Sequence, residues 1–265
     1  MYNALPPFNF MHRITVLKMT NPSDLLVFND CLYIPDDMNP RKSHLFGISD
    51  PHRIWKVPIP DSAGDVRPRK MLTSLGKWWP WSLSRMTDGK RILITTTTLK
   101  AYFWNPEEDR HETVTLPSDL HSAQHIIQLS DHSYLICHSS QDSSHLQKVC
   151  RLVLEGSAMS FLENPSCKDD LYQPEHLAEL PDGKILVVDY YNNRVLVTAK
   201  DLKSYEVLLI SGRNGNGKKR PCRIAYITRP SWVVVAFHHS VGVYSLNTDQ
   251  MGEEDDCNLQ SICSQ

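Results

Sequence analysis

Histidines are the first residues whose type and spacing could do chemistry in this chain. His121 and His125 are four residues apart, and His238 and His239 are adjacent. A zinc site needs three or four convergent ligands. Residues four apart meet on a helix, but a strand does not bring them together in the same way. We therefore predict hydrogen-bonded or solvent-facing histidines, with no metal and no catalytic residue.

A glycine-rich loop, Gly212–Lys218, fits the pattern Gly-x4-Gly-Lys that cradles phosphate groups. That loop also requires Ser or Thr after the lysine, for magnesium, and a helix that follows. Here Lys219 and Arg220 follow, and then Pro221, which interrupts a helix. We predict a connection between structural units and no nucleotide cofactor.

These residues must be positioned by short strands, because the chain repeats a strand–turn–strand pattern. The clearest copy is Pro174–Val197, in which two apolar runs flank Asp182-Gly183. Asp-Gly supplies the positive φ that a tight hairpin requires. Copies around residues 29, 88, 131, 182 and 229 recur at a spacing of about 50 residues, which is typical of propeller blades with four strands each.

The repeats predict an all-β fold, a β-propeller with five repeats and therefore five or six blades. We expect an N-terminal extension over residues 1–12, a single propeller domain over 13–246, and an acidic, disordered tail over 247–265. The fifth repeat lacks an outer strand, and Arg13–Leu17 is the segment expected to supply it. This exchange would close the ring and protect its strand edges.

The stretch from Pro174 to Val197 resembles an NHL repeat, on the residues Pro174, Ala178, Asp182, Gly183, Val187, Asp189, Asn192 or Asn193, Arg194 and Val195. The third repeat, with Gln128–Asp131 and Val149–Val153, resembles the NHL propellers of invertebrate tripartite-motif-like proteins, and the resemblance covers roughly residues 13–246. The resemblance implies a ligand-binding propeller in which the asparagine and arginine stabilise the blade. His176 replaces the usual glycine of the pattern.

An enzyme is the second possibility, because some propellers of the gluconolactonase type hold calcium at the central axis. Calcium binds six or more oxygens. The residues expected at the starts of the inner strands are mostly poor oxygen donors: Leu25, Trp81, His125, His176 and Arg223. Asp189, and Asp36 or Asp37, are the carboxylates left for such a calcium-dependent hydrolase.

We predict a non-enzymatic scaffold that binds a protein or peptide through loops on one rim. Function on a rigid scaffold is commonly carried by its loops. Trp81 is expected to pack in the core. The residues expected to contact the partner are Trp78, Trp79, His138, Tyr190, Tyr191, Asn192, His238 and His239.

RNA binding is the alternative interaction, through the basic clusters Arg67–Lys70 and Lys218–Arg220. The net charge of −2 gives no global positive field, so DNA binding is not expected. The sequence has no apolar run long enough for a membrane helix, and its seven cysteines are odd in number with no Cys-x-x-Cys pair. We expect a cytoplasmic protein with reduced thiols.

Overall fold

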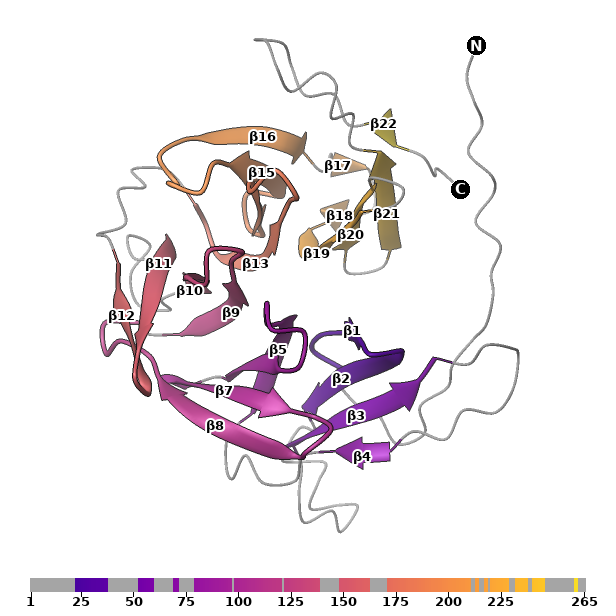
Figure 1. Ribbon diagram of the computed structural model, residues 1–265. Helices are drawn as coiled ribbons and strands as arrows, with labels where there is room; N and C mark the ends of the chain where they lie inside the picture. Colours follow the sequence, from indigo (N-terminus) through magenta and orange to yellow (C-terminus); the bar gives the residue numbers. More distant parts are fainter. Residues whose placement is uncertain are drawn as a thin grey trace.

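A computed structural model of the chain describes residues 22–37, 52–59, 69–71, 79–96, 98–120, 122–138, 148–162, 171–210, 213–214, 217–218, 220–228, 232–237, 240–245 and 260–261. In these residues the secondary structure is β-strand and turn, so the predicted all-β class is confirmed. Consecutive strands pair antiparallel within five units of four strands, and the second and third units are joined by their outer strands into one eight-stranded sheet. The units surround a common centre as the blades of a propeller do (Figure 1).

The first unit contains β1 (Leu26–Phe28), β2 (Cys31–Asp37), β3 (His52–Pro58) and β4 (Arg69–Met71). The second contains β5 (Pro80–Arg85), β6 (Ile92–Thr96), β7 (Lys100–Asn105) and β8 (Arg110–Thr115). The third contains β9 (Ala123–Gln128), β10 (Tyr134–His138), β11 (Lys148–Glu155) and β12 (Ala158–Phe161).

The fourth unit contains β13 (Pro174–Glu179), β14 (Ile185–Asp189), β15 (Arg194–Thr198) and β16 (Tyr205–Ile210). A short hairpin of β17 (Arg213–Asn214) and β18 (Gly217–Lys218) follows. The fifth unit contains β19 (Pro221–Ile227), β20 (Trp232–Phe237), β21 (Ser240–Ser245) and β22 (Gln260–Ser261). The first strand of each unit lies nearest the centre and the fourth lies outermost (Figure 1).

The hairpin between the first two strands is built in the same way in the second, third and fourth units. An aspartate, Asp88, Asp131 or Asp182, accepts a hydrogen bond from the backbone N–H two residues later at 2.8, 3.1 and 3.0 Å. The residue directly after each aspartate has a positive φ: 66° at Gly89, 67° at His132 and 84° at Gly183. Aspartate followed by glycine favours this turn, which explains why the repeat is visible in the sequence.

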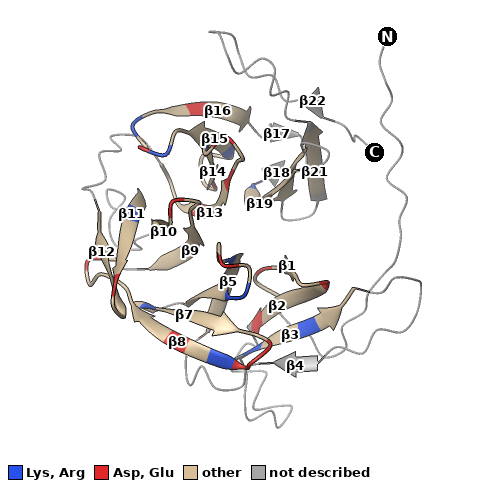
Figure 2. Cartoon of the chain, viewed as in Figure 1, with Lys and Arg blue, Asp and Glu red and all other residues tan. Residues whose placement is uncertain are grey.

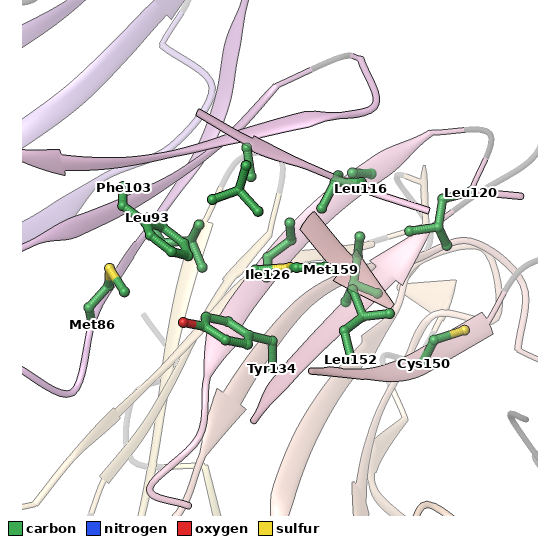
Figure 3. Close-up of a cluster of buried hydrophobic side chains, with 14 residues drawn as sticks. Met86, Leu93, Phe103, Leu116, Leu120, Ile126, Tyr134, Cys150, Leu152 and Met159 are labelled. Carbon is green, nitrogen blue, oxygen red and sulfur yellow. The ribbon is translucent and has the colours of Figure 1, made fainter. Parts of the chain in front are cut away.

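Adjacent units pack through apolar side chains that alternate along the strands. The second and third units share one such cluster, which includes Leu93, Phe103, Ile126, Tyr134 and Leu152 (Figure 3). The third and fourth units, and the fourth and fifth, share similar clusters. These cores make the inner strands rigid supports for the side chains at the centre.

The predicted closing strand, residues 13–17, lies outside the described residues, so this expectation is not tested. In the described residues the fourth strand that pairs with β21 is β22, through Tyr244–Ser261 and Ser245–Gln260. The C-terminal segment, expected to be a disordered tail, therefore contributes a short strand. The outer edge of β21, the third strand of this unit, has backbone groups that need hydrogen-bond partners. A strand from either end of the chain could supply them. The described part of the chain contains no helix that could cross a bilayer.

Candidate functional site

Each unit begins with the same irregularity, and this irregularity builds the centre of the molecule. The register of the inner strand shifts by one residue just after its start in the second to fifth units, between Pro80 and Ser82, Ala123 and His125, Pro174 and His176, and Pro221 and Arg223. In the first unit Pro22 forms the equivalent bridge with Asp36. A β-bulge of this kind turns the side chain that follows it.

The residue two positions after each start is therefore equivalent in all five units. We call these residues the axial ring: Asp24, Ser82, His125, His176 and Arg223. Ligand atoms of Asp24, His125 and His176 all lie within 4.8 Å of one another, although the residues come from three different units. The ring brings polar groups from distant parts of the sequence to one point.

Asp24 is the anchor of the axial ring. Its side chain is 4% exposed, and its Oδ1 accepts a hydrogen bond from the Leu25 N–H at 2.9 Å. Its Oδ2 accepts one from the Leu83 N–H of the second unit at 2.8 Å. Burial raises the pKa of this carboxyl, while Arg223 and the two backbone donors lower it. Backbone donors from two units thus fix the direction of the carboxylate.

Arg223 joins the fifth unit to the first. Its Nη2 donates to the Ser23 carbonyl oxygen at 2.6 Å, and its Nε lies 3.3 Å from Asp24 Oδ1. Its Nη1 lies 3.6 Å from Glu175 of the fourth unit. Burial raises the pKa of Glu175, and Arg223 opposes that shift. One guanidinium therefore contacts three of the five units.

The two histidines of the axial ring stack on each other, with ring centroids 3.7 Å apart and planes inclined by 16°. His125 Nδ1 accepts a hydrogen bond from the Leu177 N–H at 3.2 Å, so a neutral His125 ring carries its proton on Nε2. Burial, with the nearby Arg223 charge, lowers the pKa of His125 to about 3, and a contact with the Leu83 backbone offsets part of the shift. Burial also lowers the pKa of His176, so both rings are neutral at pH 7.

The sequence located only part of this ring. His125, His176 and Arg223 were expected at the axis and are found there. In the first two units the expected residues were Leu25, one position too late, and Trp81, one position too early. The start of an inner strand is fixed by its pairing with the second strand, including the one-residue shift, so an assignment from sequence can miss the axial residue by one position in either direction. The available signal was proline at the start of four units: Pro22, Pro80, Pro174 and Pro221.

The carboxylates considered for calcium lie away from the axis, in structural ion pairs. Asp189 accepts hydrogen bonds from the Tyr172 N–H at 2.8 Å, Asn192 Nδ2 at 2.9 Å and Arg194 Nε at 2.7 Å. In the first unit Asp36 pairs in the same register position with Arg53, at 3.2 Å. These pairs stabilise the junction of the second and third strands. The side chain of Asp37 is outside the described residues.

An aromatic cluster lies on the rim at which β14 ends and β13 and β19 begin. The ring of Tyr191 lies 4.7 Å from that of Tyr172 and 5.1 Å from that of Tyr190. The guanidinium of Arg220 sits over Tyr190 at 5.0 Å and over Tyr191 at 4.7 Å. We call Tyr172, Tyr190, Tyr191 and Arg220 the tyrosine cluster. Tyr172 is 45% exposed and Tyr191 is 37% exposed, so the cluster is accessible.

The other predicted partner-binding residues are placed differently. Asn192 is exposed beside the tyrosine cluster, and Trp79 is half-buried, as is Trp81. His138 is a correction: it is 5% exposed, because β10 is covered on both faces, and its Nε2 lies 3.5 Å from Cys150 Sγ. Trp78, His238 and His239 lie outside the described residues.

The sequence missed Tyr172 and Arg220, which complete the tyrosine cluster. Tyr172 precedes β13, and its N–H donates to the carboxylate of Asp189, the last residue of β14. Arg220 follows the β17–β18 hairpin, into which the glycine-rich loop folds, with β19 rather than a helix after it. Neither contact has a local sequence signal.

Charged residues are spread around the ring rather than gathered on one arc, as Figure 2 shows for the described residues. The described strands that carry parts of the two basic clusters belong to different units. Arg69 and Lys70 belong to β4, the outermost strand of the first unit, whereas Arg220 precedes the inner strand of the fifth. The residues Arg67 and Pro68 lie outside the described part.

No family model matches the sequence, and no curated protein matches it significantly. Solved structures do resemble the fold. A chain of the nidogen/laminin complex matches with a TM-score of 0.60 and 14% identity over 84% of this chain and 75% of its own. A structural-genomics target named as a candidate gluconolactonase matches with a TM-score of 0.58 and 14% identity, over 85% of this chain and 74% of its own.

The calcium-binding protein regucalcin from Agrobacterium tumefaciens matches with a TM-score of 0.56 and 11% identity, over 86% of this chain and 71% of its own. The neighbours therefore include a protein from a protein–protein complex and proteins of the gluconolactonase and regucalcin type. At these identities the likeness establishes the fold and no more: the chain is a β-propeller.

Proposed function

We propose that this propeller is a non-enzymatic interaction module of NHL type, which binds a protein or peptide in the cytoplasm through the tyrosine cluster. The observation that carries the proposal is the convergence of Tyr172, Tyr190, Tyr191 and Arg220 on one rim, with two of the rings more than a third exposed. Tyrosine and arginine are enriched among residues that dominate binding energy at protein interfaces.

The cluster is supported from below, so that little ordering is needed when a partner binds. Asp189 is fully buried and holds the backbone of Tyr172, the side chain of Asn192 and the guanidinium of Arg194. This agrees with the structural role that the NHL resemblance implies for the asparagine and arginine. A pre-organised aromatic surface loses less conformational entropy on binding than a mobile one.

The comparison with the nidogen/laminin complex supports the proposal in general terms, since that structure is a complex between proteins. The four described cysteines, Cys31, Cys137, Cys150 and Cys222, are free thiols, which suits a reducing compartment.

Single-stranded RNA is a second candidate ligand, favoured by one observation. Arg220 belongs to the basic cluster Lys218–Arg220 and lies over two tyrosine rings. Proteins that recognise single-stranded RNA stack its bases on aromatic rings and arginine planes. The acidic Glu175 and the net charge of −2 favour the peptide.

A peptide library displayed on phage, selected against the full chain, tests the proposal. Replacing Tyr191 or Arg220 by alanine should weaken the selected peptides by about 2 kcal/mol, or roughly thirtyfold in Kd. Val207→Ala and Arg110→Ala are matched controls, because both side chains are exposed on outer strands, at 43% and 84%. Equal binding by wild type and both cluster variants would contradict the proposal.

Mixed-sequence single-stranded RNA, titrated at several salt concentrations, forms the second arm. The peptide proposal expects no binding that depends on Arg220. RNA affinity that falls steeply with salt and is lost in Arg220→Ala would replace it with the second candidate.

A further inference from the structure

The axial ring contains buried polar atoms that have no hydrogen-bond partner. Apart from Arg223 Nε, which lies 3.3 Å from Asp24 Oδ1, they are Ser82 Oγ, His125 Nε2 and His176 Nδ1, in side chains from three consecutive units at the same register position. Ser82 and His125 are 1% exposed and His176 is 8% exposed. Buried polar groups in proteins are almost always satisfied, by protein, water or a bound species. Three such atoms in one ring indicate a bound species at the axis.

We propose that the axial ring binds a divalent transition-metal ion, such as Zn²⁺, through Asp24, His125 and His176. One ligand atom from each lies within 4.8 Å of the others. Ligands on one tetrahedral zinc ion lie about 3.4 Å apart, given bonds of about 2.0–2.1 Å to nitrogen and oxygen. The atoms therefore need only small side-chain movements to reach a common ion.

The donor set selects the class of metal. Two imidazole nitrogens and one carboxylate oxygen suit zinc, cobalt, nickel or copper, whereas calcium takes six to eight oxygens. Both imidazoles are neutral at pH 7, so each has a lone pair that a metal can use. The site differs in this from a calcium centre built of carboxylate and amide oxygens.

The groups around the ligands hold them in place. Asp24 accepts hydrogen bonds from the backbone N–H groups of Leu25 and Leu83. His125 and His176 are fixed by their mutual stacking. Hydrogen bonds to the ligands from outside the coordination sphere orient them and raise metal affinity.

Two features oppose the metal and make the expected affinity moderate. His125 must shift its proton from Nε2 to Nδ1 before Nε2 can bind the ion, and this ends the hydrogen bond from the Leu177 N–H at 3.2 Å. The positive charge of Arg223 also repels the ion. We therefore expect a Kd of about micromolar rather than the much tighter binding of closed structural zinc sites.

Titration of the full chain with Zn²⁺, and separately with Co²⁺, tests the site. The expected result is Zn²⁺ binding that raises the melting temperature, and a visible Co²⁺ spectrum of a low-coordinate nitrogen and oxygen site. The Zn²⁺ affinity should fall roughly tenfold or more in each of three variants, His125→Gln, His176→Gln and Asp24→Asn. His111→Gln, on β8 and outside the axial ring, is the matched control and should leave it unchanged.

Retained Zn²⁺ affinity and an unchanged Co²⁺ spectrum in the folded histidine variants would overturn the proposal and leave water as the species at the axis. If those variants do not fold, Arg223→Met decides the question, since it keeps all three ligands and removes the opposing charge. Tighter Zn²⁺ binding by Arg223→Met supports the site, and equal or weaker binding overturns it. The result does not depend on the tyrosine cluster or its partner.

Discussion

The junction between the second and third units differs in kind from the junction between the fifth and first. The former is an apolar core of 14 buried side chains (Figure 3). Its outer edge is joined by parallel pairing of β8 with β12. The latter is joined, in the described residues, by Arg223 to Ser23 and Asp24. Apolar side chains on the two end units remain exposed, including Leu25 at 56% and Val241 at 61%.

The difference reflects what each junction must do. Units that are consecutive in the chain are held close by a short connection, so non-directional apolar packing is enough to align them. The fifth and first units are about 200 residues apart in sequence, and their junction depends on directional bonds that specify one arrangement. The stability of the apolar junction should therefore fall in proportion to the side-chain volume that is removed. The stability of the polar junction should depend on one side chain, Arg223.

The largest effect is expected from Phe103→Ala in the apolar junction. Phe103 is 3% exposed and stacks on Tyr134, with ring centroids 5.9 Å apart. Removing a buried aromatic ring leaves a cavity and should lower the free energy of unfolding by about 3–5 kcal/mol. Urea denaturation measures the loss. Leu25→Ala, at an exposed site on the other junction, is the control and should cost under about 0.5 kcal/mol.

A cost for Phe103→Ala below about 1 kcal/mol would mean that this cluster does not hold the two units together. This result would contradict the view that apolar packing aligns the second and third units.

A somewhat smaller effect is expected from Arg223→Met in the polar junction. The methionine keeps most of the apolar stem but leaves the Asp24 carboxylate and the Ser23 carbonyl without their cationic partner. Loss of one partner of a mostly buried ion pair should cost about 2–3 kcal/mol, less than in a fully buried pair because the Arg223 side chain is 21% exposed.

A double-mutant cycle with Asp24→Asn isolates the contact. Coupling of about 1 kcal/mol or more is expected between positions 24 and 223. Additive losses would show that Arg223 stabilises the fold through something other than Asp24. The contact between these two residues would then not hold the fifth unit to the first.

Much of the fold could be predicted from sequence because its turns are local. Asp88-Gly89 and Asp182-Gly183 each specify a hairpin through side-chain capping and a positive φ, and the β-branched strands follow at regular spacing. Closure could not be predicted, because it depends on which distant strand reaches β21. Gln260–Ser261 has no strand pattern in the sequence, yet in the described residues it pairs with β21 as β22.

The axial ring could be predicted in part. His125, His176 and Arg223 were expected at the axis, whereas Asp24 and Ser82 were each missed by one residue, because the start of an inner strand is fixed by pairing that the sequence does not show. The tyrosine cluster was half predictable: Tyr190 and Tyr191 occupy an expected loop, but Arg220 and Tyr172 reach them from other connections. Side-chain contacts across units carry no local signal.

The smallest effect is expected from His132→Gly, which tests whether polar contacts matter at the apolar junction. His132 occupies the position of Gly89 and Gly183, with φ of 67°, a conformation that costs a non-glycine residue about 1 kcal/mol. Its Nδ1 lies 3.3 Å from Thr87 Oγ1 of the second unit, an exposed contact. Glycine removes the strain and loses the contact, so thermal unfolding should show a net gain of about 0.5 kcal/mol. A loss of more than about 1 kcal/mol would show that the exposed hydrogen bond, and not only the apolar core, holds the second and third units together.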